Sequence, residues 1–208
     1  MSIRQTSLVA SVVACGIFLL ALLLAGAGVP EYSHRIHPLA LRGASGLPGA
    51  GLFNAGAFVL PGVGLLLAAQ GLRPALARAG WPARIGLTLV QGSALAFAAQ
   101  GLLPLDMRTL DAAANRLHAL AWMLWWIAFA PGALLLAFAG GRGRGFAVAG
   151  VAAALLVPWL AVLAPIGAWV GLAQRLAFLA WFGWWLLAAR AFSRSAASAP
   201  GSWPPART

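Results

Sequence analysis

The sequence predicts an all-α polytopic membrane protein, built as a bundle of six transmembrane helices. Of its 208 residues, 62% are hydrophobic and only 8% are charged, whereas soluble domains carry about 25% charged residues. The mean hydropathy is +0.89. The apolar residues are grouped in six runs, each near the roughly 20 residues that a helix needs to cross a bilayer. Because lipid offers no hydrogen-bond partners, each run is expected to be helical throughout.

The predicted spans form one transmembrane domain over residues 1–192, and the Pro-rich, polar residues 193–208 predict a disordered cytoplasmic tail. The spans are Leu8–Val29, Gly51–Leu72, Ile85–Leu103, Leu117–Ala139, Phe146–Pro165 and Leu172–Phe192. An alternative for the first span is a cleaved signal peptide, since "LLLAGAG" places small residues after an apolar core. Pro61, Pro131 and Pro158 fall inside spans and predict kinks there.

The arginines predict the orientation. Lysine is absent, so all 14 basic residues are arginines, and cytoplasmic loops of membrane proteins carry the excess of positive charge. With a cytoplasmic N-terminus, the larger group falls inside: Arg4, Arg73, Arg78, Arg84, Arg142, Arg144, Arg190, Arg194 and Arg207. The smaller group falls outside: Arg35, Arg42, Arg108, Arg116 and Arg175. Both termini are therefore expected in the cytoplasm. The Ala-, Gly- and Leu-rich, lysine-free composition is typical of a high-GC bacterial genome, which indicates a bacterial inner membrane.

The net charge of +11 is typical of nucleic-acid-binding proteins, but here the arginines are scattered between apolar runs and form no single patch. We therefore expect membrane lipid as the partner, or another membrane protein, and no nucleic acid. The oligomeric state is left open by the sequence. The single cysteine, Cys15, lies in the first apolar run and cannot form an internal disulfide.

With this orientation, every acid and every histidine lies at the outer face. Glu31, His34 and His37 belong to the first outer loop, Asp106 and Asp111 belong to the second, and His118 lies one turn into the fourth span. The run "RTLDAAANRLHALAWMLWW", residues 108–126, predicts a helix capped by Thr109 or Asp106. Helical spacing would place one stripe on a single face: Asp111, Asn115, His118, Trp122 and Trp125.

These residues predict a polar site at the outer face. Its members are Asn54, Asp106, Asp111, Asn115, His118, Gln174 and Arg175, with His34, His37 and Glu31 as weaker candidates. Arg175 is expected to lie opposite an acid or to hold an anionic head group. The plainer interpretation of the loop histidines is an interfacial belt of polar and aromatic residues.

A zinc site is a further alternative, because three nitrogen or carboxylate ligands plus water suit zinc. His37, His118 and Asp106 are the candidate ligands. Their pattern is not the H-E-x-x-H helix signature of zinc hydrolases. Haem would need histidines on facing helices, whereas two of the three lie in one loop. No cofactor is therefore predicted.

Three stretches resemble a known family: "HPLALRGASGLPGAGLFNAGAFVLPG", "SALAFAAQGLLPLDMRTLDAAANRLHALAWMLWW" and "GLAQRLAFLAWFGWW". In order and spacing they are similar to the bacterial six-span domain of unknown function 998, over about residues 8 to 192. The matching positions are Asn54, Pro61, Gly62, Asp106, His118, Gln174 and Arg175. The resemblance implies a six-span membrane fold and no particular reaction.

Two functions remain open from the sequence. The first is a non-enzymatic inner-membrane protein whose outer cavity binds a lipid head group, a small amphiphile or a partner helix. The second is an intramembrane hydrolase or transferase, with or without a metal, that acts at the periplasmic leaflet. The second function would use His118 together with Asp106 or Asp111, because general acid–base chemistry needs paired titratable groups in hydrogen-bond reach.

Overall fold

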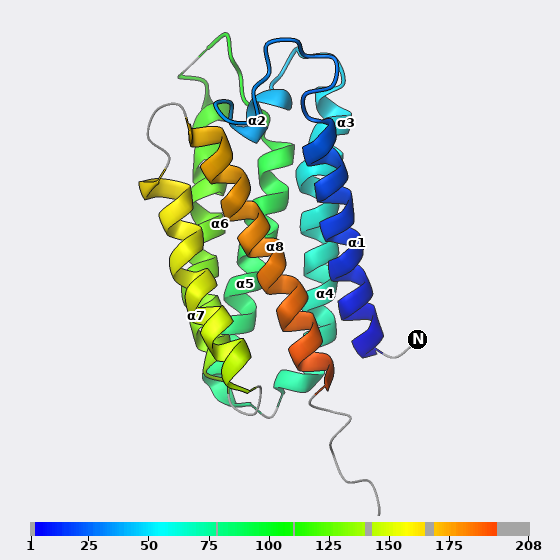
Figure 1. The fold of residues 1–208 in the computed structure, drawn as a ribbon, viewed down its shortest axis with the longest axis vertical. Coiled ribbons are helices and arrows are strands. Elements are labelled where there is room, and N and C mark those ends of the chain that lie inside the picture. The colour runs from blue at the N-terminus through cyan, green and yellow to red at the C-terminus, as the bar shows by residue number, and fades with distance from the viewer. Residues whose placement is uncertain (1–2, 78, 110, 140–142, 165–168, 195–208) are drawn as a thin grey trace, which may run out of the picture.

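The structure, a computed structural model, describes residues 3–77, 79–109, 111–139, 143–164 and 169–194. Six helical segments of this part are long and apolar enough to cross a membrane, and they form an elongated bundle (Figure 1). The six are α1 (Ile3–Leu24), α3–η1–α4 (Ala50–Leu76), α5 (Gly80–Leu102), α6 (Ala113–Ala137), α7–η2 (Arg144–Leu163) and α8 (Val170–Arg194). A short helix, α2 (Leu39–Arg42), lies in the first long loop. The predicted all-α six-span fold class is confirmed.

The helix bounds differ from the predicted spans mainly in the first helix. α1 begins at Ile3 and ends at Leu24, whereas the predicted span ran to Val29. Residues 25–28 form turns, and Gly28 has a φ of 71°, which side chains rarely adopt. At the other end of the chain, α8 extends to Arg194, which is past the predicted start of the tail. Residues 195–208 lie outside the described part of the chain.

The polypeptide alternates between the two ends of the bundle, so its loops separate into two groups (Figure 1). Residues 25–49 come together with residues 103–109 and 111–112 at one end, which we call the loop end. The start of α1 and the close of α8 lie at the opposite end, which we call the terminal end. α8 packs against α1, α4 and α7, so the last helix contacts helices from both halves of the chain.

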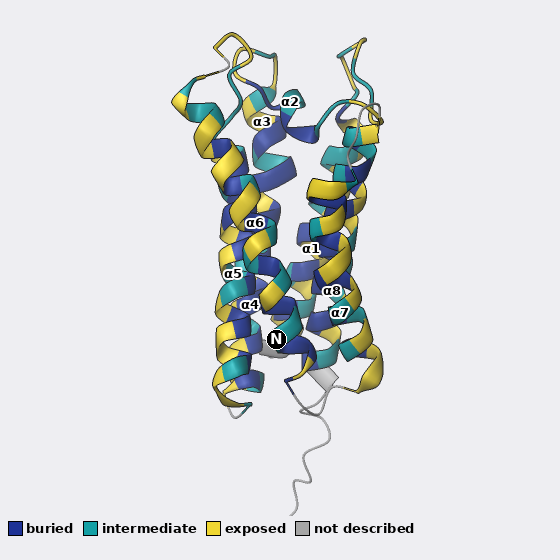
Figure 2. Cartoon of the chain, turned by 90° about the vertical axis from the view of Figure 1, so that its left-hand side faces the viewer, coloured by how far each residue is buried: buried dark blue, intermediate teal, exposed yellow. Residues whose placement is uncertain are grey.

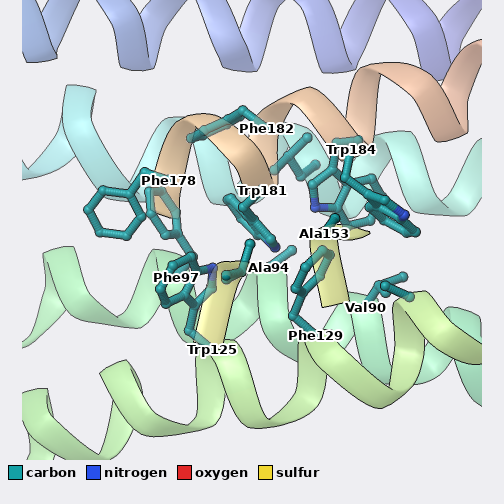
Figure 3. Close-up of a cluster of buried hydrophobic side chains, with 14 of the residues drawn as sticks. Val90, Ala94, Phe97, Trp125, Phe129, Ala153, Phe178, Trp181, Phe182 and Trp184 are labelled. Carbon is teal, nitrogen blue, oxygen red and sulfur yellow. The ribbon is translucent and has the colours of Figure 1, made fainter. Parts of the chain in front are cut away.

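An aromatic cluster fills the centre of the bundle and fixes α8 (Figure 3). Phe97 of α5 lies 4.7 Å from Trp181 between ring centroids, and Trp125 of α6 lies 4.9 Å from Phe178. All four rings are fully buried. Since lipid tails are as apolar as these side chains, van der Waals packing and not water exclusion holds transmembrane helices together. Interlocking large rings maximises that packing.

Figure 2 shows exposed residues along the outward faces of the helices, and many of them are large and apolar. Leu23, Leu52 and Leu155 expose 76%, 82% and 65% of their side chains, respectively. Monomeric soluble proteins rarely expose continuous apolar surfaces of this kind. The burial pattern therefore agrees with the composition, and lipid is the solvent around the bundle.

Two of the three prolines that were predicted to kink a span lie next to π-helical segments. Pro61 follows η1 (Ala55–Val59), and Pro158 directly precedes η2 (Trp159–Leu163). Proline removes one backbone donor, and a wider π turn is one way for the chain to accommodate that loss. Pro131 differs, because α6 remains α-helical through it.

Glycines allow two helix pairs to approach closely. A Cβ atom at Gly62 of α4 would lie 2.8 Å from both Ala94 O and Ala98 N of α5. Gly132 of α6 has the same relation to α5, with Gly86 O 3.0 Å from its would-be Cβ. Small residues at such crossings are what lets transmembrane backbones come together.

We predict that Gly62→Ala lowers the free energy of unfolding by about 1–3 kcal/mol, because overpacking against backbone forces the helices apart. The control is Gly183→Ala in α8, where the added methyl meets nothing within 4 Å. Thermal unfolding in detergent, followed by circular dichroism, would compare the two variants. Equal melting temperatures for both would show that the α4–α5 contact is not tight.

Candidate functional site at the loop end

Residues 35–39 of the first loop bind to the first turns of α8. Leu172 N donates to Arg35 O at 3.0 Å, which satisfies a helix N-terminal N–H that has no intrahelical acceptor. Leu39 N donates to the side-chain oxygen of Gln174 at 2.7 Å. The guanidinium of Arg35 lies 5.0 Å from the ring centre of Trp169, just before α8. The loop is therefore held by backbone and side-chain groups of one helix end.

Arg175 completes this attachment from inside. Its side chain is only 5% exposed. It donates to His37 O at 2.9 Å and to Gly171 O at 2.7 Å, and it also binds the Tyr32 hydroxyl. These partners are neutral oxygens of the loop and the helix. Among its described contacts Arg175 therefore bonds to two buried carbonyls and a hydroxyl and not to an acid, while the expectation of an anionic head group stays a prediction.

The surroundings of the first loop also shift the pKa values of Tyr32 and His34. Burial raises the pKa of Tyr32, and the nearby Arg175 guanidinium offsets part of that rise. The ring of His34 lies 5.4 Å from that of Tyr32 between centroids, and burial, followed by the charge of Arg175, lowers the pKa of His34 below its usual 6.5. Both rings are therefore neutral at pH 7. Protonation of His34 as the pH falls below 6.5 would disfavour the folded loop.

The second loop closes on itself around Asp106. One carboxylate oxygen of Asp106 accepts from the backbone N–H groups of Arg108 at 2.8 Å and Thr109 at 3.2 Å. Asn115 then holds the backbone of Asp106 from α6: its Oδ1 accepts from Asp106 N at 2.7 Å, and its Nδ2 donates to Asp106 O at 2.9 Å. Short polar side chains such as aspartate favour turns of this kind over helix.

The prediction for the start of this helix is therefore wrong. α6 begins at Ala113, and its N-cap residue, Ala112, makes no side-chain capping bond. Neither Thr109 nor Asp106 caps it, because the Asp106 carboxylate already serves the turn. Asp111 precedes the helix and so falls outside the predicted stripe, and its backbone oxygen accepts from Arg116 at 2.9 Å.

Two further candidates hold backbone groups at the loop end. Asn54, which is buried, donates to Gly43 O at 2.8 Å. His118 Nδ1 lies 2.7 Å from Leu103 O at the end of α5. A carbonyl can only accept, so Nδ1 carries the hydrogen, and a neutral ring then holds its lone pair at Nε2.

The predicted site residues thus divide into two groups. The first group bonds to the backbone of loop-end segments and consists of Asn54, Asp106, Asn115, His118, Gln174 and Arg175. The second group is exposed and consists of Glu31, His34 and Asp111. His37 is half-buried, and its Nδ1 accepts from Ser33 N at 3.0 Å.

The candidate zinc ligands are not assembled. Within the described ranges, no three side chains of His, Cys, Asp or Glu come together in a group that could hold a metal ion. His37, His118 and Asp106 instead bond to three different backbone segments.

A cavity of about 290 Å³ lies at the loop end between α6, α8, η2 and both loops. His118 and Gln174 are its polar side chains. The apolar walls include Pro38, Leu105, Trp122, Leu160 and Val170. Neither aspartate lines it. Sequence reasoning had placed Trp122 on the face of His118 but missed the other walls, because an apolar residue in a span looks the same whether it faces a cavity or another helix.

Residues 12–191 match the family described as "Protein of unknown function (DUF998)". The chain belongs to the DUF998 family. The match confirms the resemblance found in the sequence and includes all the candidate residues. No curated protein and no solved structure matches this DUF998 protein. Its function therefore has to be argued from the geometry.

We predict that Arg175→Gln speeds amide hydrogen exchange in residues 35–41 by about tenfold or more, since losing a charged donor to a buried carbonyl costs about 1.5–3 kcal/mol. The control is Arg116→Gln, which removes the same charge from an exposed side chain at the same end. Exchange measured by mass spectrometry in detergent micelles would compare them. Unchanged exchange in both variants would remove Arg175 from the attachment of the loop.

Proposed function

We propose that this DUF998 protein binds a neutral amphiphile, whose polar head enters the loop-end cavity while its apolar part extends into the bilayer. The observation that carries the proposal is the lining: a mainly apolar cavity in which His118 and Gln174 supply hydrogen-bonding groups. Ligand sites typically combine apolar walls with a few placed polar groups. Ala119, which also lines the cavity, is exposed, so the cavity borders the lipid-facing surface.

The chemistry of the lining favours an uncharged head. Gln174 uses its carbonyl oxygen to bind Leu39 N, which leaves its amide nitrogen as a donor. His118 offers a lone pair at Nε2 when its ring is neutral. Arg175, the nearby cation, binds His37 O and Gly171 O and is not part of the cavity lining. A carbonyl or hydroxyl head, as in a quinone, a long-chain alcohol or a diacylglycerol, fits this set better than a phosphate.

The volume of the cavity fits the head group of an amphiphile better than a whole lipid molecule. Its volume of about 290 Å³ is at the lower end of ligand pockets, which span about 300–1,000 Å³. The arginine distribution supports an orientation in which this end of the bundle faces the periplasm of a bacterial inner membrane. The ligand would accordingly come from the outer leaflet of that membrane.

The geometry supports binding more than hydrolysis. A hydrolase that used His118 would need a carboxylate or nucleophile within hydrogen-bond reach. The Asp106 carboxylate instead accepts from two N–H groups of its own turn, and the cavity lining contains no acid. Among the described residues, His118 is therefore a hydrogen-bonding group without a catalytic partner.

We predict that Ala119→Trp weakens binding of neutral short-chain probes by about tenfold or more, because the indole occupies space that the ligand needs. The probes are decylubiquinone, farnesol and dioctanoylglycerol, with dioctanoylphosphatidylglycerol as the charged comparison. The control is Ala113→Trp, an exposed position on α6 outside the cavity. Binding to delipidated protein would be measured by native mass spectrometry.

Equal affinities for the two tryptophan variants would contradict the proposal, as would preferential binding of the charged lipid at this cavity. Metal analysis of the purified protein tests the alternative. One equivalent of zinc that disappears in His118→Ala would favour the hydrolase instead.

A further inference from the structure

A second polar cavity lies at the terminal end of the bundle, and the proposed function does not involve it. It has a volume of about 430 Å³ and lies between α4 and α5. Arg73 contributes from α4, and Arg84, Thr88 and Gln91 contribute from α5. Two guanidinium groups, a hydroxyl and an amide thus line one cavity.

No acidic side chain balances the two arginines. The acids of the whole chain are Glu31, Asp106 and Asp111, and all three belong to loop-end segments. Arg73 donates to the side-chain oxygen of Gln91 at 3.4 Å, and Arg84 donates to Ala77 O at 3.3 Å. These bonds are long and go to neutral oxygens.

Each guanidinium group also has more N–H donors than the described part of the protein uses. An arginine carries five N–H donors. In the described part of the chain, Arg73 and Arg84 each donate one hydrogen bond to a protein oxygen. The cavity is therefore a concentrated positive charge with donors available for an anion.

The position of Trp81 indicates that the cavity lies near the membrane interface. Trp81, at the start of α5, is 70% exposed, and exposed tryptophans mark the head-group level of a bilayer. Arg84 follows one turn later. Thr88 and Gln91 lie four and seven residues beyond Arg84, which puts the three side chains on one face of α5. Arg73, Arg84 and Thr88 are exposed, so the cavity is accessible from the lipid side at about the depth of phosphate and glycerol.

We propose that this cavity binds the phosphate of an anionic phospholipid in the leaflet at the terminal end. Guanidinium groups pair with phosphate oxygens by parallel N–H bonds. The amide nitrogen of Gln91 is placed to donate to a glycerol oxygen, whereas the Thr88 hydroxyl already donates to Arg84 O at 3.1 Å and lines the cavity beside it. The buried Leu76 and Leu87 form the apolar side of the cavity. Basic pockets between transmembrane helices suit anionic lipid heads for the same reasons.

The simpler interpretation is that these arginines only attract anionic lipid diffusely, as arginines in cytoplasmic loops do. A matched pair of double variants separates the two. Arg73→Gln with Arg84→Gln removes two charges from the cavity. Arg144→Gln with Arg190→Gln removes two charges from exposed positions at the same end and outside the cavity.

Delipidated protein in detergent would be titrated with phosphatidylglycerol and phosphatidylcholine and followed by native mass spectrometry. The wild type should bind phosphatidylglycerol more tightly. The cavity variant should lose about tenfold or more of that affinity, while the control variant loses no more than the several-fold expected of diffuse attraction. Equal losses in the two double variants would overturn the site.

A second substitution tests the cavity with its charge intact. Thr88→Trp should weaken phosphatidylglycerol binding by blocking the space, whereas Ile85→Trp, an exposed neighbour outside the cavity, should not. Wild-type binding in Thr88→Trp would also overturn the proposal. So would inorganic phosphate that competes with the lipid at equal concentration, because the site would then recognise a free anion. Binding of neutral probes at the loop end should be unchanged in all these variants, which keeps this test independent of the proposed function.

Discussion

The loop end depends on one constraint, which is that polar backbone groups near a bilayer must find partners within the protein. The first turns of α8 meet this need for residues 35–39, through Leu172 N, Gln174 and Arg175. Asn54, Asn115 and His118 serve other loop-end carbonyls or amides in the same way. Most polar side chains at the loop end thus attach loops to helix ends. A ligand there must bind to the polar atoms that these hydrogen bonds do not use.

The aromatic core fixes the position of α8, the helix to which the first loop is attached. Phe178 and Trp181 lie on α8 within the packed cluster, one and two turns beyond Arg175. The same helix therefore carries both the packing that fixes its position and the groups that hold the first loop. Because interiors packed in this way deform little, the cavity next to Gln174 and His118 is expected to be formed before a ligand arrives.

The two ends of the bundle have opposite chemistry. The acids and histidines belong to the loop end, where the cavity is mostly apolar and is lined, among the described residues, by no acid and no arginine. The terminal end carries arginines without acids, and its cavity contains two of them. That division is the basis for proposing a neutral ligand at one end and an anionic lipid at the other. The first would concern the function of the protein, and the second its fit to the membrane.

Much of the fold was determined by the sequence alone, because crossing a bilayer requires long apolar helices whose hydropathy is visible in any one span. The family resemblance and the loop membership of the acids and histidines were also visible there. The tertiary structure alone decided the partners of the polar residues. Leu39 and Gln174 lie 135 positions apart, and no local pattern links them. It also decided the start of α6, where a turn around Asp106 competes with the helix, and the cavity walls, which come from separate elements whose apolar residues look alike in sequence.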